Sequence, residues 1–117
     1  FWSTECTICR AELTTMQDLH DQMSSNGRLE IIAIHAGNDV KGVVEQMEIN
    51  PVSYPMLIDM DLQMGHWGIP TLPTTYLVTP DGSFAYRVLG VRVWNSPSMV
   101  DFLREVFDDY DRERSKI

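Results

Sequence analysis

Helix-like and strand-like stretches alternate along the first half of the chain, and this order constrains the fold more than any other feature. The short apolar segment Leu29–His35 is typical of a strand that is buried on both faces. It lies between two helical patterns, one beginning near Cys6 and one running from Val40 to Met47. The residues that form one face of the first pattern recur at spacings of three and four: Cys9, Leu13, Met16, His20 and Met23.

The second half has a different order. Tyr54–Ile58 reads as a short strand, and 61–67 as a short helical or turn segment. Thr74–Val78 and Ser83–Leu89 flank Pro80-Asp81-Gly82, a strong turn signal, so they predict a β-hairpin. Ser96 and Pro97 then open a last helix whose apolar stripe consists of Met99, Phe102, Leu103, Val106 and Tyr110.

This order predicts an α/β fold with a central mixed sheet flanked by helices. Strands separated by helices pair in parallel through right-handed crossovers, whereas the C-terminal hairpin is antiparallel. We expect residues 1–117 to form a single domain that is incomplete at its N-terminus. Only Phe1 and Trp2 represent the first strand, and the chain does not begin with Met. We expect the charged tail, residues 108–117, to fray.

Composition excludes several classes of protein. No apolar run approaches the roughly 18 residues that a membrane span needs. The net charge of −8 is opposite to that of a typical nucleic-acid-binding protein. Two cysteines are too few for a small disulfide-rich scaffold, so that class of protein is excluded.

The two cysteines stand two residues apart in Cys6-Thr7-Ile8-Cys9, at the predicted start of the first helix. A thiolate at a helix N-terminus is stabilised by unpaired backbone amides and by the helix dipole. We therefore interpret Cys6 as a redox nucleophile and Cys9, one turn further in, as the thiol that resolves a mixed disulfide.

Other interpretations of the pair stay open. Half of a zinc site would need further ligands, and His20, His35 and His66 show no paired metal spacing. A structural disulfide would close a very short loop and stabilise little. Two inert buried thiols or a thiolate copper chaperone are also compatible with the spacing. A peroxide-reducing enzyme is a further alternative, with Ser3 three residues before Cys6.

Two segments carry a resemblance to a known family. Residues 1–13 read FWSTECTICRAEL, and residues 67–78 read WGIPTLPTTYLV. Together they resemble the two active-site segments of thioredoxin-like proteins of the TlpA/ResA/CcmG (DsbE) family. The hairpin turn at residues 80–82 and the order of elements extend the resemblance over essentially the whole chain.

The resemblance implies site residues besides the cysteines. Pro73 matches the cis-proline opposite the cysteine pair, and Leu72 would offer its backbone to an extended substrate segment. Thr71 and Trp67 would complete this substrate-positioning surface. Glu5 replaces the family's usual tryptophan before the first cysteine, and its charge should raise the pKa of Cys6. Arg10 should act in the opposite direction.

The resemblance also implies the biology. It predicts a thiol-disulfide oxidoreductase that acts as a reductant on protein disulfides and is reloaded by an upstream electron donor. No cofactor or metal beyond the Cys6–Cys9 pair is expected, and nucleic acid is not a partner. We expect a monomer that makes no membrane contact itself, anchored or secreted by an upstream segment in a bacterial periplasm or its equivalent. Cytochrome c biogenesis is among the expected pathways.

Three histidines and Glu12 are further candidates for a role at the site. His20 lies on the apolar stripe and is interpreted as a packed residue. His35 ends the second strand, near the sheet edge where ligands often bind, and His66 is interpreted as solvated. Glu12 is placed on the polar side of the first helix, which makes it a poor proton carrier for the cysteines.

Overall fold

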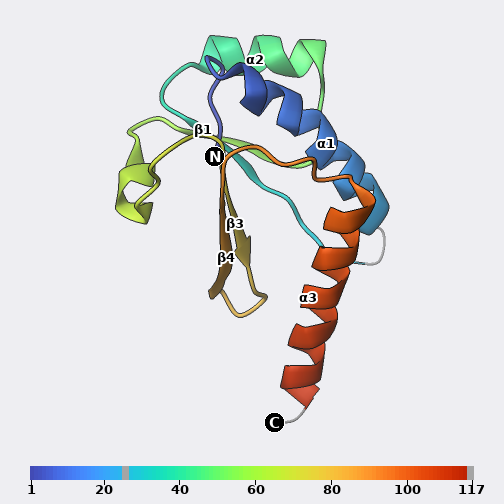
Figure 1. The fold of residues 1–117 in the computed structure, drawn as a ribbon. Coiled ribbons are helices and arrows are strands. Elements are labelled where there is room, and N and C mark those ends of the chain that lie inside the picture. Colours follow the sequence, from blue (N-terminus) through green and yellow to red (C-terminus); the bar gives the residue numbers. More distant parts are fainter. Residues whose placement is uncertain (25–26, 116–117) are drawn as a thin grey trace.

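The structure, a computed structural model, describes residues 1–24 and 27–115 (Figure 1). The predicted turn residues 25–26 and the last two residues of the charged tail lie outside this range. The elements follow the predicted order: α1 (Thr7–Met23), β1 (Ala33–Ala36), α2 (Val40–Ile49), β2 (Met56–Asp59), the 3₁₀ helix η2 (Gln63–Trp67), β3 (Thr74–Val78), β4 (Phe84–Leu89) and α3 (Pro97–Ser115).

The strands form two small sheets. β1 and β2 pair in parallel, with Ala33 opposite Met56, and β3 and β4 pair in antiparallel fashion, with Thr74 opposite Leu89. The predicted directions are therefore correct, but the single continuous sheet is not observed among the described residues.

Phe1 and Trp2 connect the two sheets. The Trp2 amide donates to the Ile34 carbonyl (3.1 Å), and Trp2 makes a parallel bridge with His35. Phe1 exchanges backbone hydrogen bonds with Thr74, at 2.7 and 3.2 Å. These two residues bond to both sheets and so link them.

The strand predicted over Leu29–His35 is shorter than expected. β1 begins at Ala33, because its parallel partner β2 offers only four residues for pairing. Ile32 is 58% exposed, so the prediction of burial on both faces is wrong for this segment.

The buried hydrophobic residues form two clusters, one at each half of α1. The first contains Trp2, Cys9, Leu13, Ala33, Val43 and Tyr54, and it holds α1 against α2 and β1. The second contains Leu19, Met23, Trp94, Val100 and Leu103, and it attaches α3 to the C-terminal half of α1. The cysteine pair thus belongs to the cluster at the N-terminal half of α1. Within the described residues, no helix is long and apolar enough to cross a membrane.

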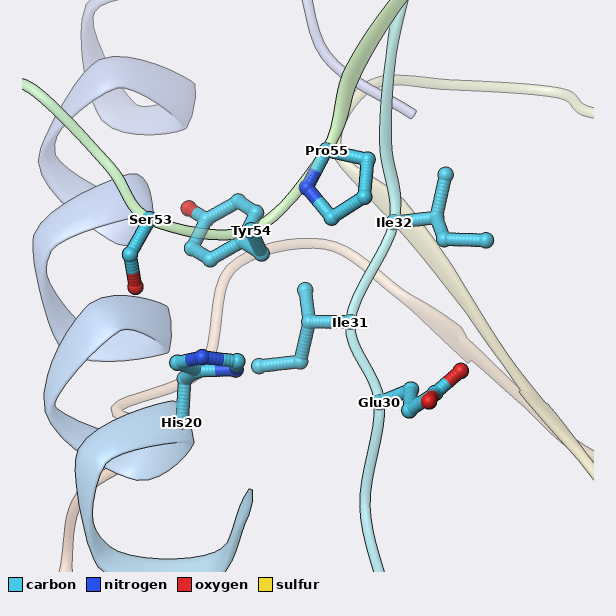
Figure 2. A pocket seen from close by; sticks show the side chains of 7 residues that line it. All are labelled: His20, Glu30, Ile31, Ile32, Ser53, Tyr54 and Pro55. Atoms are coloured by element: carbon cyan, nitrogen blue, oxygen red, sulfur yellow. The ribbon is translucent and has the colours of Figure 1, made fainter. Parts of the chain in front are cut away.

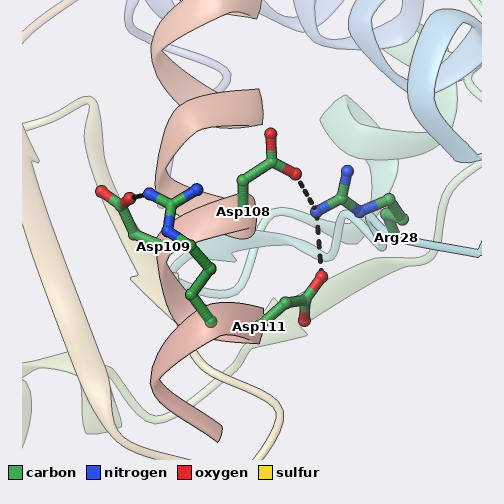
Figure 3. Close-up of polar contacts among 5 residues, drawn as sticks. Arg28, Asp108, Asp109 and Asp111 are labelled. Atoms are coloured by element: carbon green, nitrogen blue, oxygen red, sulfur yellow. Dashed lines mark hydrogen bonds and ion pairs between the residues drawn. The ribbon is translucent and has the colours of Figure 1, made fainter. Parts of the chain in front are cut away.

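The charged end of the chain is more ordered than predicted. Instead of fraying from Asp108, α3 continues to Ser115. Arg28 forms ion pairs with Asp108 (2.9 Å) and Asp111 (3.1 Å), as Figure 3 shows. These contacts join successive turns of α3 to the segment that follows α1.

Candidate active site

Cys6 and Cys9 form a disulfide across the first turn of α1, with their Cα atoms 5.2 Å apart. Cys6 is the N-cap residue, with extended backbone angles (φ −101°, ψ 104°). Its sulfur accepts a hydrogen bond from the Cys9 amide at 3.3 Å. This amide is one of the unpaired donors of the helix N-terminus, so it would also stabilise a Cys6 thiolate after reduction.

The two sulfurs differ in access. Cys9 is only 1% exposed and belongs to the core, whereas Cys6 is half-buried at its edge. An incoming sulfur can therefore approach Cys6 far more easily than Cys9. The positions fit the roles predicted for the two residues.

The segment before Cys6 is held from several sides. The Cys6 amide donates to the Ser3 carbonyl (3.1 Å), and the Glu5 amide donates to the Ser3 hydroxyl (3.2 Å). The Arg10 guanidinium bonds to the Thr4 carbonyl, so Arg10 folds back onto this loop. Glu5 is exposed beside Cys6, where solvent screens its charge.

The second predicted segment surrounds Pro73. The Leu72–Pro73 peptide bond is cis, and Pro73 is fully buried. The Thr74 side chain, which is 0% exposed, donates to the Thr71 carbonyl at 2.6 Å and closes the loop. Leu72 packs against the same buried cluster as Cys6, while Thr71 is exposed. The two segments therefore meet at one part of the core.

Trp67 lies at the end of η2 in an aromatic cluster, which we define as Phe1, Trp67, Tyr76 and Phe84. Neighbouring ring centroids in this cluster are 4.9 to 6.3 Å apart. Trp67 stays 42% exposed. The Asp59 carboxylate accepts from the Gln63 and Met64 amides, each at 2.7 Å, and so fixes the start of η2.

Glu12 corrects the sequence interpretation. It is only 7% exposed and follows Cys9 by three residues, so both lie on the buried face of α1. Its carboxylate accepts the Arg92 amide at 2.8 Å. Burial raises the pKa of Glu12, although the hydrogen bond from Arg92 acts against this. The i, i+3 spacing from Cys9 could have indicated that Glu12 shares the buried face of α1. The sequence could not show that segment 90–94 crosses α1 and covers Glu12.

The three histidines occupy different environments. His35 is 2% exposed and lies beneath the loop that carries Cys6. His66 is exposed, as predicted. His20 is half-buried, as predicted, and lines a pocket of about 210 Å³ beside Ile31 and Tyr54 (Figure 2). Among the described residues, no group of three or more His, Cys, Asp or Glu side chains is placed to hold a metal ion.

Comparison with known proteins adds sequence relatives. The chain is 32% identical over 91 residues to the thiol-disulfide oxidoreductase ResA of Bacillus subtilis, which covers 77% of this chain and 50% of that protein. It is 30% identical over 91 residues to ResA of Geobacillus thermodenitrificans, with 77% and 52% covered. The chain thus spans about half the length of the curated relatives it matches.

Solved structures share the fold. A protein assigned as thiol:disulfide interchange protein DsbE from Chlorobium tepidum superposes with a TM-score of 0.76 at 19% identity, covering 90% of this chain and 72% of that one. A protein assigned as a disulfide isomerase from Bacteroides thetaiotaomicron gives a TM-score of 0.69 at 16% identity, with 91% and 67% covered. These likenesses confirm the predicted thioredoxin-like fold.

A family model described as the AhpC/TSA family matches residues 1–87, a range that contains both cysteines, Glu12 and Pro73. The ResA sequences confirm the resemblance that the two active-site segments carry. The chain belongs to the AhpC/TSA family, and within the thioredoxin-like fold it is similar in sequence to the ResA thiol-disulfide oxidoreductases.

Proposed function

We propose that this chain exchanges thiols and disulfides with protein substrates, with Cys6 as the nucleophile and Cys9 as the resolving thiol. The observation that carries the proposal is the asymmetry of the pair. The half-buried sulfur of Cys6 caps α1 and accepts the Cys9 amide, while Cys9 itself is 1% exposed. The names of the ResA relatives, thiol-disulfide oxidoreductases, support the same activity.

The reaction begins from the reduced pair. The Cys6 thiolate attacks one sulfur of a substrate disulfide, forms a mixed disulfide and displaces the other substrate sulfur as a thiolate. The Cys9 thiolate then attacks the Cys6 sulfur, which closes the Cys6–Cys9 disulfide and releases the second substrate thiolate. Two electrons pass from the cysteine pair to the substrate. A dithiol donor reduces the pair again by the same steps in reverse, and no further cofactor is needed.

Cys9 must lose its proton before it can attack, and burial makes this loss unfavourable. Glu12 lies one turn further along α1, is itself buried and has a raised pKa. A carboxylate of this kind can accept a proton from Cys9 and return it to solvent. We assign Glu12 this proton-carrying role.

The loop around Pro73 supplies the substrate-binding surface in this proposal. Leu72 and Cys6 pack against the same buried cluster, and the exposed Thr71 precedes Leu72. An extended substrate segment would pair with the backbone here while Trp67 contacts its side chains. The substrates are disulfide-bonded proteins outside the cytoplasm, including those of cytochrome c biogenesis, and the domain acts on them as a monomeric reductant.

The direct test uses the Cys9→Ser variant with oxidised glutathione and with a disulfide-bonded peptide. We expect a stable mixed disulfide at Cys6, detected by mass, in the variant but not in Cys6→Ser. Equilibration of the unmodified chain against a thiol buffer gives the potential of the pair. A potential near −270 mV, the value typical of thioredoxin, supports a reductant, and one near −120 mV, typical of a strong oxidant, refutes that direction. Rapid peroxide consumption without mixed-disulfide formation would favour the peroxide-reducing alternative.

A further inference from the structure

His35 lies behind the loop that carries Cys6, and it makes specific contacts with this loop. Its Nε2 accepts a hydrogen bond from the Thr4 amide at 3.0 Å, and its Nδ1 lies 2.9 Å from the Gly37 carbonyl. The side chain is 2% exposed, and its ring packs edge-on against Trp2, with centroids 5.1 Å apart.

These contacts determine the protonation state. A carbonyl oxygen can only accept, so Nδ1 must carry the hydrogen. The Thr4 amide can only donate, so Nε2 must offer its lone pair. The Thr4 hydroxyl also lies 3.3 Å from Nε2, but it donates to the Asp39 carboxylate at 2.6 Å. The imidazole is therefore neutral, with its hydrogen on Nδ1.

Thr4 is the residue through which this contact reaches the active site. It stands two residues before Cys6, and each of its polar groups is bound by a different element. The amide bonds to His35 of β1, the carbonyl to Arg10 of α1, and the hydroxyl to Asp39 at the N-cap of α2. Asp39 is exposed and Arg10 is half-buried, so His35 is the one fully buried anchor of the three.

We propose that His35 is a positioning residue for the thiol chemistry. Its neutral imidazole holds the Thr4 amide, and so keeps the sulfur of Cys6 within reach of the Cys9 amide that stabilises the thiolate. The charged groups around the contact are the Asp39 carboxylate and the Arg10 guanidinium, both bound to Thr4. The catalytic importance of this contact rests on the proposed function. Its test does not, because the test measures the reactivity of the Cys6 thiol.

The test measures the thiol itself and requires no substrate. In a Cys9→Ser background, Cys6 is the single thiol, and iodoacetamide reports its thiolate fraction. His35→Gln keeps an acceptor near the Nε2 position, whereas His35→Leu removes the acceptor. His66→Gln is the matched control, because His66 is exposed.

At neutral pH we expect His35→Leu to slow alkylation about tenfold, the effect of losing one hydrogen-bonded contact. His35→Gln and His66→Gln should stay within about twofold of the parent at that pH. The first keeps a hydrogen-bond acceptor for the Thr4 amide, and the second leaves His35 unchanged. Equal rates in a folded His35→Leu variant and the parent would overturn the proposal.

Hydrogen exchange of the Thr4 amide provides a second measurement if the leucine variant does not fold. In the parent and in His66→Gln this amide should exchange slowly, because it is bound to the buried Nε2 of His35. Exchange of the Thr4 amide as fast as that of an unbonded loop amide in the parent contradicts the proposal. Failure of the proposed function would appear separately, as absence of mixed disulfides with intact alkylation kinetics.

Discussion

Replacing Glu12 with glutamine should change how stability depends on pH. Burial raises the pKa of Glu12 above its ordinary value of 4.5, so the folded protein binds this proton more tightly than the unfolded chain. The stabilisation from protonation is complete below the unfolded pKa and is lost as pH rises through the folded pKa. At any pH above the folded-state pKa the wild type therefore carries the cost of an ionised buried carboxylate, and Glu12→Gln does not.

The size of the effect is limited by linkage. Between the two pKa values, the free energy of unfolding of the wild type should fall relative to Glu12→Gln by up to about 1.4 kcal/mol for each pH unit. Glutamine can still accept the Arg92 amide, which is bound at 2.8 Å in the structure. Alanine cannot, so Glu12→Ala should be less stable than Glu12→Gln by about 1–3 kcal/mol at every pH, the cost of an unsatisfied buried amide.

Urea unfolding of the oxidised protein from about pH 4.5 to 8 measures these differences, since a single small domain is expected to unfold in one transition. The alanine variant separates loss of the hydrogen bond from loss of the charge. Parallel stability curves for the wild type and Glu12→Gln would show that Glu12 is solvated in the folded state. The assignment of Glu12 as the proton carrier for Cys9 would then lose its physical basis.

Two other substitutions test the surroundings of the site. Asp59→Ala removes two hydrogen bonds of 2.7 Å to the start of η2, and we expect a loss of about 1–3 kcal/mol together with a shift in Trp67 fluorescence. An unchanged spectrum would mean that η2 is held by other contacts. Arg28→Ala should cost less than about 1 kcal/mol, because both of its carboxylate partners are more than half exposed, and the difference should shrink in 1 M salt. A larger, salt-independent loss would assign Arg28 a packing role instead.

The sequence was sufficient to predict the order of elements and the position of the cysteine pair. Both depend on local information: the helical repeat of α1, the turn at residues 80–82, and the placement of Cys6 at a helix start. The strand from Leu29 was predicted too long, because pairing depends on how many residues the partner strand offers. Four residues of β2 pair with β1. The length of this pairing cannot be predicted from the local sequence of either segment.

Glu12 and His35 were missed or left undecided for a related reason. Their burial comes from contacts with residues far away in the sequence, Arg92 for Glu12 and Thr4 for His35. Polar residues on a helix or at a strand end are usually exposed, so a sequence pattern assigns them to the surface. Their partners are backbone amides, which no side-chain motif encodes.

Glu5 offers the clearest test of what local sequence can predict about reactivity. Its position beside Cys6 predicts that its charge disfavours the thiolate, so Glu5→Gln should speed alkylation of Cys6. Because the side chain is exposed, the expected gain corresponds to an interaction of about 0.2–1 kcal/mol, a rate increase of less than about sixfold. The gain should largely disappear in 1 M salt, where the screening length is about 3 Å.

Arg10→Gln should slow the reaction, partly through loss of its positive charge and partly through loss of its bond to the Thr4 carbonyl. Salt should therefore abolish the Glu5 effect but leave part of the Arg10 effect. If Glu5→Gln changes the rate by more than tenfold, or if salt leaves its effect intact, the carboxylate must approach the sulfur much more closely in the reduced protein than its exposed position in the disulfide form implies.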